Sequence, residues 1–229
     1  MIDWIANLMV QTLKSLHDLT GNYGAAVVLF AVFIKILLYP LTHKSYQSMK
    51  DMQRVQPEMD KLQKKYAKSD PEKYQQEVTA LFRKHKVNPL SGCLPLLLQM
   101  PILFAIWKAI THAPELFEQA YFLWIHPGPL QNLYPKLFAS SLAGADLPML
   151  LFYALTMYLS QKLTPTQSGA AGQAFLAVFM TLFITYLAWV SKWPCALLLY
   201  WSVFTFLTVA QQAFIMRAPD KPLAEATSA

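Results

Sequence analysis

Long apolar runs alternate with short polar segments along most of this 229-residue chain. Five of the runs carry very few charged side chains: residues 21–45, 90–112, 147–162, 173–190 and 195–216. A helix needs roughly 20 apolar residues to cross about 30 Å of hydrocarbon, and the uninterrupted apolar part of each run is somewhat shorter than that. The pattern predicts an all-α membrane protein with five transmembrane helices, around which the bilayer is locally thinned.

The first 20 residues differ, because apolar and polar side chains alternate there with a helical period. The positions that recur at steps of three or four are Ile2, Ile5, Met9, Leu13, Leu16 and Thr20. This spacing predicts an amphipathic helix over residues 1–20. The helix could lie in the membrane interface or pack against the protein in the ordinary way, and the interfacial helix is our prediction.

Residues 46–89 are polar and predict a hairpin of two helices. The first helix has an apolar stripe rich in Met, including Met52 and Met59, and ends near Ala67. The segment Ser69-Asp70-Pro71-Glu72 then predicts a new helix, because it offers a capping residue, Pro at the first helical position and an acid close behind. The apolar stripes of the two helices should cover each other. The excess of Met favours an adaptable contact surface, although a hairpin with no binding role fits as well.

Basic residues are concentrated in and beside this hairpin. Residues 44–86 hold eleven of the nineteen Lys and Arg and six of the thirteen Asp and Glu. Because cytoplasmic loops of membrane proteins collect Lys and Arg, we place the hairpin, the loop at 163–172 and the tail at 217–229 in the cytoplasm. The N-terminus and the non-helical loop at 113–146 are then outside. Nucleic-acid binding is the weaker alternative, since the bases alternate with acids rather than forming a purely basic stripe.

Lys35 lies inside the first apolar run. No Asp or Glu occurs in any of the five runs, so the sequence offers no intramembrane counter-ion. A Lys at the centre of a membrane helix costs roughly 2.5–3.5 kcal/mol on insertion scales and usually faces water or a partner. Its helical face continues through Ala31, Tyr39 and Thr42 and grows more polar toward the cytoplasm. We therefore predict a hydrated groove, and the alternative is that Lys35 only extends toward the interface.

Catalytic motifs are missing from the sequence. It contains no GxxxxGK[ST] phosphate loop, no GxSxG elbow and no group of His, Cys or Glu at metal-ligand spacing. We expect a protein that is not an enzyme and that takes no cofactor and no metal. The polar residues in the apolar runs fit hydrogen bonding between helices: Gln99, Thr205, Thr208, Gln211 and Gln212.

Several motifs resemble those of the YidC family of membrane protein insertases. The most specific is residues 88–102, Asn-Pro-Leu-Ser-Gly-Cys-Leu-Pro-Leu-Leu-Leu-Gln-Met-Pro-Ile. The others are Tyr39-Pro40-Leu41-Thr42, Phe122–His126, Gln161–Thr166, Leu199-Tyr200-Trp201 and Gln211-Gln212. They occur in the family's order and cover nearly the whole chain from Gly21 to Arg217.

This resemblance implies five core spans, a cytoplasmic hairpin, and a hydrophilic groove open to cytoplasm and lipid. Lys35 stands where the family usually has Arg, and Tyr200-Trp201 matches an aromatic pair of the substrate-contacting fifth span. We expect the groove to be lined by Lys35, Ala31, Gln99, Tyr200, Trp201 and Gln211. We expect the hairpin to bind partners through Met52, Met59, Lys61, Lys64, Lys65 and Arg83.

The function that the resemblance implies is that of an insertase or chaperone in a bacterial inner membrane. Such a protein moves short hydrophilic tails of nascent membrane proteins across the membrane and releases their apolar spans into lipid, without nucleotide. The implied partners are nascent chains, the ribosome, targeting factors and the secretion translocon, with no specific nucleic acid. A pure assembly chaperone or a translocon subunit fits equally. A secondary transporter or channel subunit is the alternative from another class, and the chain lacks the paired interrupted spans expected of one.

Overall fold

The computed structural model describes residues 2–67, 69–85, 87–88, 94–163 and 169–219, and this part of the chain is almost entirely helical. Its only β-type pairing is an isolated bridge between Phe122 and Ile125. The predicted all-α class is therefore confirmed for the described residues. The helices are α1 (Ile2–Thr20), α2 (Tyr23–Tyr66), α3 (Pro71–Lys84), α4 (Leu94–His112), α5 (Glu115–Glu118), α6 (Pro129–Leu133), α7 (Leu147–Leu163), α8 (Gly169–Val190) and α9 (Cys195–Arg217).

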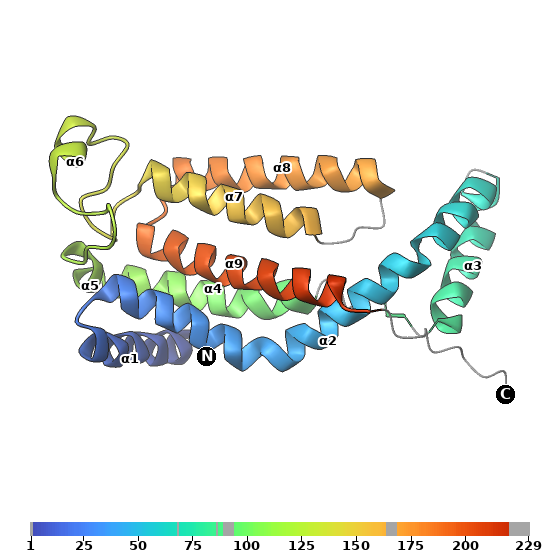
Figure 1. Ribbon diagram of the computed structural model, residues 1–229, viewed down its shortest axis with the longest axis horizontal. Helices are drawn as coiled ribbons and strands as arrows, with labels where there is room; N and C mark the ends of the chain where they lie inside the picture. The colour runs from blue at the N-terminus through green and yellow to red at the C-terminus, as the bar shows by residue number, and fades with distance from the viewer. Residues whose placement is uncertain (1, 68, 86, 89–93, 164–168, 220–229) are drawn as a thin grey trace.

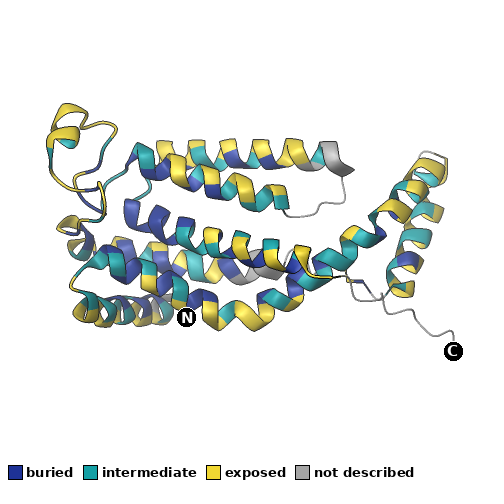
Figure 2. Ribbon diagram, in the orientation of Figure 1, coloured by how far each residue is buried: buried dark blue, intermediate teal, exposed yellow. Residues whose placement is uncertain are grey.

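The long helices run side by side as an elongated bundle, with α9 at its centre (Figure 1). Helix α9 packs against α2, α7 and α4, while α8 packs on α7 at the edge of the bundle. The short helices α5 and α6 lie at one end, and α3 with the second half of α2 projects from the other (Figure 1). The first turns of α9 form the most buried segment, from Cys195 to Tyr200 (Figure 2).

Helix α2 runs without a break from the first apolar run into the hairpin. We predicted separate segments at 21–45 and 46–89, but residue 45 lies inside this continuous helix. Pro40 and Pro57 are both internal to α2, which visibly changes direction along its length (Figure 1). A proline removes one backbone donor and bends a helix without ending it when the flanking turns are well packed.

The hairpin forms as the sequence predicted. Helix α2 ends at Tyr66, and Asp70 caps α3 by accepting a hydrogen bond from the backbone N–H of Lys73 (3.0 Å). The facing stripes pack into a small core of their own, made by Val55, Met59, Leu81 and Val87. Pro89, expected to end this segment, and the motif residues 90–93 lie outside the described residues.

Helix α1 packs against α2 and α4 rather than standing apart from the bundle. Its buried face consists of Ala6, Met9 and Leu13, and its chain turns into α2 at Gly21, whose φ of +67° favours glycine. In Figure 1 α1 lies alongside the start of α2. The predicted amphipathic pattern thus serves helix packing in this structure, and the placement of α1 in a membrane interface stays a prediction.

The outward faces of several helices are apolar, and α8 shows this most clearly. Phe175 is 71 % exposed and Leu182 65 % exposed, and exposed side chains continue along α7 and α2 (Figure 2). Extended exposed apolar surface of this kind is typical of a face that meets lipid or another apolar partner. By length and composition α2 and α9 could each cross a membrane, while the count of five spans stays a prediction.

A buried carboxylate organises the end of the bundle that carries α5 and α6. Asp146, only 1 % exposed, accepts hydrogen bonds from the indole Nε1 of Trp124 (3.0 Å) and from the backbone N–H groups of Ala139 (3.1 Å) and Met149 (2.8 Å). The last of these bonds caps the N-terminus of α7. We predicted a non-helical loop at 113–146, but the segment contains two short helices and is held together by this carboxylate.

The same segment also seals the start of α9. The backbone N–H of Cys195 donates to the carbonyl of Gly144 (2.8 Å), and that of Ala196 donates to the carbonyl of Leu142 (2.9 Å). These bonds satisfy donors that a helix leaves free in its first turn. On the neighbouring side Gly24 lets Phe122 approach α2 so closely that an added Cβ would lie 2.4 Å from the ring. This end of the bundle is therefore closed by ordered backbone.

We expect Asp146→Ala to lower the free energy of unfolding by about 3 kcal/mol, because it removes a helix cap and leaves two further buried donors unsatisfied. Asp70→Ala is the matched control. It removes a capping hydrogen bond of similar length from an exposed helix N-terminus and should cost about 1 kcal/mol. Denaturation of both variants in detergent, followed by circular dichroism, measures the difference. Equal losses would show that the Asp146 carboxylate does no more than cap α7.

Candidate functional site

Lys35 is buried between α2 and α9, with 6 % of its surface exposed. Its ammonium nitrogen donates a hydrogen bond to the hydroxyl oxygen of Thr208 on α9 (2.8 Å). The same nitrogen lies 5.1 Å from the ring centroid of Phe204 and 5.7 Å from that of Tyr46. These contacts are one hydrogen bond to a neutral hydroxyl and two cation–π interactions, which together offset only part of the cost of burying a charge.

A second polar contact joins the same two helices closer to the hairpin. The hydroxyl of Thr42 donates to the side-chain oxygen of Gln211 (3.2 Å). Lys35, Thr42, Thr208 and Gln211 thus form a line of polar side chains along the contact between α2 and α9, which we call the polar seam. Such hydrogen bonds between membrane helices contribute about 1 kcal/mol each, so they favour contact without locking it.

The polar seam is not fully satisfied by the protein. The side-chain nitrogen of Gln211 is buried with no hydrogen-bond partner among the described residues, and the hydroxyls of Ser45 and Ser202 are in the same state. Buried polar groups almost always find a protein or water partner. These polar atoms can therefore form hydrogen bonds with water molecules or with the polar groups of a bound ligand.

The other residues predicted for the groove fall into two separate places. Gln99 on α4 donates to the hydroxyl of Tyr200 (3.4 Å), and Ala31 is fully buried in the core. Trp201 faces the other way, toward α7, and its ring lies 5.7 Å from that of Tyr153 and 6.0 Å from that of Trp193. Of the predicted groove residues, Lys35 and Gln211 therefore lie along the polar seam. Gln99 and Tyr200 lie on the α4 side, and Trp201 lies on the α7 side.

No carboxylate forms an ion pair with Lys35 in the part of the chain that the structure describes. The nearest partners of this ammonium are neutral oxygen and aromatic rings, so it keeps its attraction for an incoming anion. Among the same residues no group of three His, Cys, Asp or Glu could hold a metal ion. The chemistry that the polar seam supports is therefore reversible binding of acidic and polar groups.

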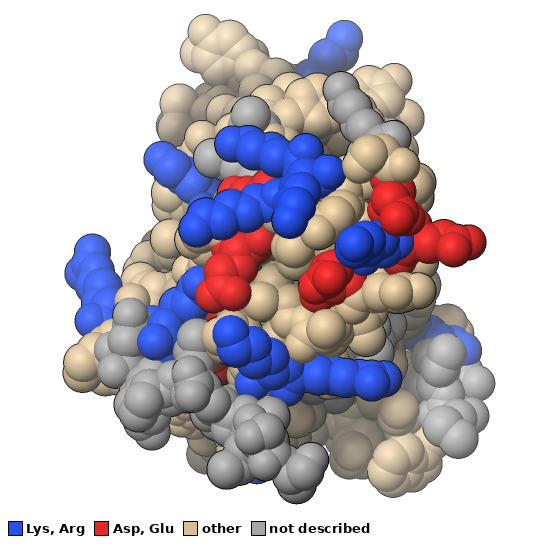
Figure 3. All heavy atoms as spheres, turned by 90° about the vertical axis from the view of Figure 1, so that its right-hand side faces the viewer, with Lys and Arg blue, Asp and Glu red and all other residues tan. Residues whose placement is uncertain are grey.

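At the hairpin the predicted partner-binding residues divide into exposed bases and packed methionines. Lys61, Lys64, Lys65 and Arg83 are exposed, and Figure 3 shows this end of the molecule with basic and acidic side chains interspersed. Met59 is 4 % exposed and packs inside the hairpin, and Met52 is half-buried beside it. Met59 therefore serves packing, and the four predicted bases are the residues of this set that lie on the surface.

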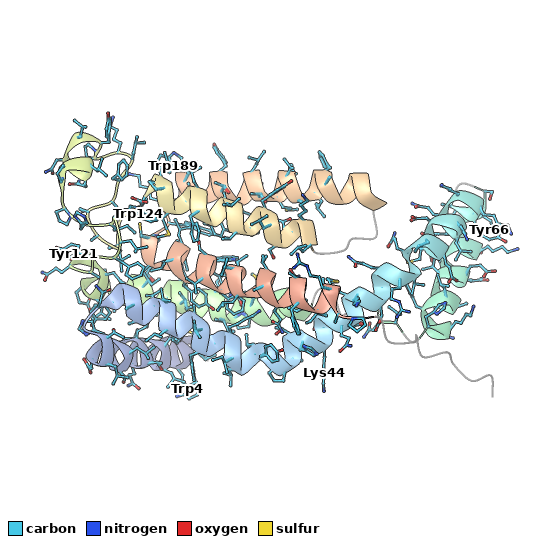
Figure 4. The ribbon with its side chains drawn as sticks, viewed as in Figure 1. Trp4, Lys44, Tyr66, Tyr121, Trp124 and Trp189 are labelled. Atoms are coloured by element: carbon cyan, nitrogen blue, oxygen red, sulfur yellow. The ribbon has the colours of Figure 1, made fainter. Side chains whose placement is uncertain are left out.

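The tip of the hairpin carries one ordered aromatic group. The ammonium groups of Lys65 and Lys73 lie 4.9 Å and 5.1 Å from the ring centroid of Tyr66, which is labelled in Figure 4. The hydrogen bond to Tyr66 is the main cause that raises the pKa of Lys65 above its ordinary value. The two ammonium groups therefore lie together at the exposed tip of the hairpin.

Sequence reasoning did not pair Lys35 with Thr208 and did not single out Asp146. Thr208 was noted only as a residue suited to hydrogen bonding between helices, because nothing in a sequence aligns positions 35 and 208. Asp146 offered one signal: it immediately precedes Leu147-Pro148 at the start of an apolar run, which is the position of a helix cap.

Comparison with known proteins supports the resemblance noted from the motifs. The family model described as 60Kd inner membrane protein matches residues 15–222. A membrane protein insertase YidC from Pelobacter propionicus is 40 % identical over 217 residues, covering 92 % of this chain and 38 % of that relative. A membrane protein insertase YidC from Geobacter sulfurreducens is 38 % identical over 224 residues, covering 95 % of this chain and 38 % of that relative.

A crystal structure of an active YidC insertase is similar to this chain, with a TM-score of 0.68 and 29 % identity over 91 % of this chain and 45 % of that one. The chain thus spans about two fifths of the length of the curated relatives it matches. Since the family model covers nearly all of the sequence and the fold agrees, the chain belongs to the 60Kd inner membrane protein family, the family of the YidC membrane protein insertases.

Proposed function

We propose that this protein inserts membrane proteins by carrying short hydrophilic tails along the polar seam between α2 and α9. The observation that carries the proposal is Lys35, a buried ammonium with a neutral hydrogen-bond partner and no ion pair among the described residues. A structural role alone would be better served by an apolar residue, because burying a charge is costly. The names of the relatives and the shared fold support the same conclusion.

The polar seam would act by replacing water around a polar tail. Charged groups that enter hydrocarbon lose their hydration, at a cost that rises steeply with each charge. An acidic group that reaches Lys35 would gain Coulomb attraction of about 4 kcal/mol at contact for an effective dielectric of about 20. The proposal requires α2 and α9 to part locally at Lys35 and Thr42, whose side chains hydrogen-bond to Thr208 and Gln211, so that the tail and water can enter.

The apolar span of the substrate would leave sideways into lipid along α7 and α9. Exposed apolar side chains line α7, including Leu151 and Leu155, and Phe206 extends this surface on α9. No nucleotide is required in this scheme, because partition of the apolar span into lipid supplies the driving force. The proposal places the protein in a bacterial inner membrane.

The proposed orientation puts the hairpin in the cytoplasm and the α5–α6 end outside. Ser69, exposed in the turn of the hairpin, and Asn132, exposed in α6, mark the two ends. We expect an impermeant thiol reagent to label Asn132→Cys in intact cells and to label Ser69→Cys only after the membrane is opened, because Lys and Arg concentrate at the hairpin end. Labelling of Ser69→Cys in intact cells would contradict the five-span topology.

Insertion should depend on the charge of Lys35. We expect Lys35→Met to insert substrates with acidic tails about tenfold more slowly than the wild type, and substrates with neutral tails nearly as well, because only acidic groups gain from the ammonium. Lys35→Arg keeps the charge and should retain most activity. The measurement is protease protection of one substrate carrying zero, one or two acidic tail residues, in liposomes that contain the purified protein.

A stability measurement separates this role from a structural one. Lys35→Met removes a buried charge, while the Thr208 hydroxyl still donates to the carbonyl of Phe204 (2.9 Å), so the variant should be as stable as the wild type or more so. If Lys35→Met inserts acidic tails at the wild-type rate, the ammonium does not contact the substrate. Uptake of small solutes by the same liposomes would instead indicate a transporter.

We also propose that the hairpin recruits acidic partners such as the ribosome, targeting factors or the translocon. The exposed bases Lys61, Lys64 and Lys65 support this role. We expect replacement of all three by Gln to slow substrate insertion in cells severalfold without changing stability, since exposed charges contribute little to folding. Replacing Lys14, Lys136 and Lys192 by Gln is the matched control at the other end of the molecule. Equal effects of the two triple variants would contradict recruitment by the hairpin.

A further inference from the structure

Two adjoining hollows meet at the hairpin-proximal end of α9. The first, of about 210 Å³, lies between α2 and the end of α9 and is lined by His43, Lys50, Asp51 and Arg54 together with Phe214. The second, of about 440 Å³, lies along α9 itself between Ala210, Ala213 and Arg217. Phe214 borders both hollows, so that a basic pocket and an apolar furrow are continuous around one aromatic ring.

The first hollow has the charge of an anion site. Lys50 and Arg54 are one helical turn apart on the same face of α2, and Asp51, the single acid in the lining, forms an ion pair with Arg54 (3.8 Å). The Lys50 ammonium donates to the carbonyl of Ala218, which directs it toward the end of α9. The Nδ1 atom of His43 is buried with no hydrogen-bond partner among the described residues, and it belongs to the lining as well. The site therefore has an excess of basic groups and an unsatisfied polar atom.

The second hollow has the chemistry of an acyl chain site. Phe214 is 72 % exposed, and the small side chains of Ala210 and Ala213 leave a furrow beside it. Phe214 shares the lining of the first hollow with His43, and beside His43 the exposed surface of α2 changes from apolar, at Leu37 and Leu41, to basic, at Lys44, which is labelled in Figure 4. For a helix that crosses a bilayer, such a change marks the depth of the lipid headgroups.

We propose that these hollows form a binding site for an anionic phospholipid. The phosphate lies between Lys50 and Arg54, and an acyl chain lies along Ala210, Ala213 and Phe214. A soluble anion or a nucleic acid would use the basic pocket but would gain nothing from the apolar furrow, whereas a lipid uses both. The site is separate from the polar seam, and its occupancy does not depend on the proposed insertion activity.

Native mass spectrometry of the full chain in detergent, titrated with phosphatidylglycerol or phosphatidylcholine, tests the charge requirement. We expect the wild type to retain phosphatidylglycerol preferentially, and the Lys50→Gln/Arg54→Gln variant to lose about tenfold of that preference. The Lys73→Gln/Lys84→Gln variant removes the same charge from α3, outside both hollows, and should keep the wild-type preference. An unchanged preference in the Lys50→Gln/Arg54→Gln variant would overturn the proposal.

The apolar half of the site has its own control on the same helix. We expect Phe214→Ala to weaken retention of phosphatidylglycerol severalfold and Phe206→Ala, at another exposed position of α9, to leave it unchanged. Equal effects of the two substitutions would mean that lipid coats α9 without a defined site. Displacement of the lipid by millimolar inorganic phosphate or by a short RNA would assign the basic pocket to a soluble anion or a nucleic acid and overturn the proposal.

Discussion

The burial of one ammonium group constrains the rest of this structure. Lys35 has left water for a site between two apolar helices, and a single hydrogen bond to a neutral hydroxyl, together with two aromatic rings, partly compensates for the loss. The hydrogen-bond acceptor for Lys35 is Thr208 on α9. This pairing is consistent with the polar residues on the inner face of an otherwise apolar helix. The polar atoms that remain unsatisfied along this contact keep it from becoming an ordinary hydrophobic interface.

The opposite end of the bundle has the contrasting chemistry. There Asp146 is surrounded by donors, and the first turn of α9 is hydrogen-bonded to ordered loop backbone. The polar groups of this network are satisfied, whereas the seam near Lys35 keeps polar atoms without a partner among the described residues. The same helix, α9, is thus hydrogen-bonded to loop backbone at its N-terminal end and carries polar atoms without a partner among the described residues nearer the hairpin. This asymmetry suits a protein that would admit polar chain from one side of the membrane alone.

Much of the fold followed from sequence because its signals are local. The restart of the hairpin at Asp70-Pro71 and the packing of its stripes depend on neighbours within one turn, and both are confirmed.

Lys35 could be singled out because a charge in an apolar run is rare. Its pairing with Thr208 could not, since it joins residues 173 positions apart. The boundary predicted at residue 45 was wrong, because the change from apolar to polar composition there ends a membrane span but not the helix, which continues to Tyr66. Met59 was expected on a contact surface but is buried, because the composition of a stripe does not show whether the stripe faces a partner or the other helix of the hairpin.

The continuity of α2 has a mechanical consequence. A single helix extends from Tyr23 to Tyr66, so the hairpin arm and the segment that holds Lys35 belong to one continuous helix, which contains Pro40 and Pro57. Pro40 lies between Lys35 and the arm, so the effect of a tilt of the arm on the contact between α2 and α9 depends on the stiffness of the helix at that proline. The hairpin and the polar seam are thus joined by helical backbone, with no loop between them.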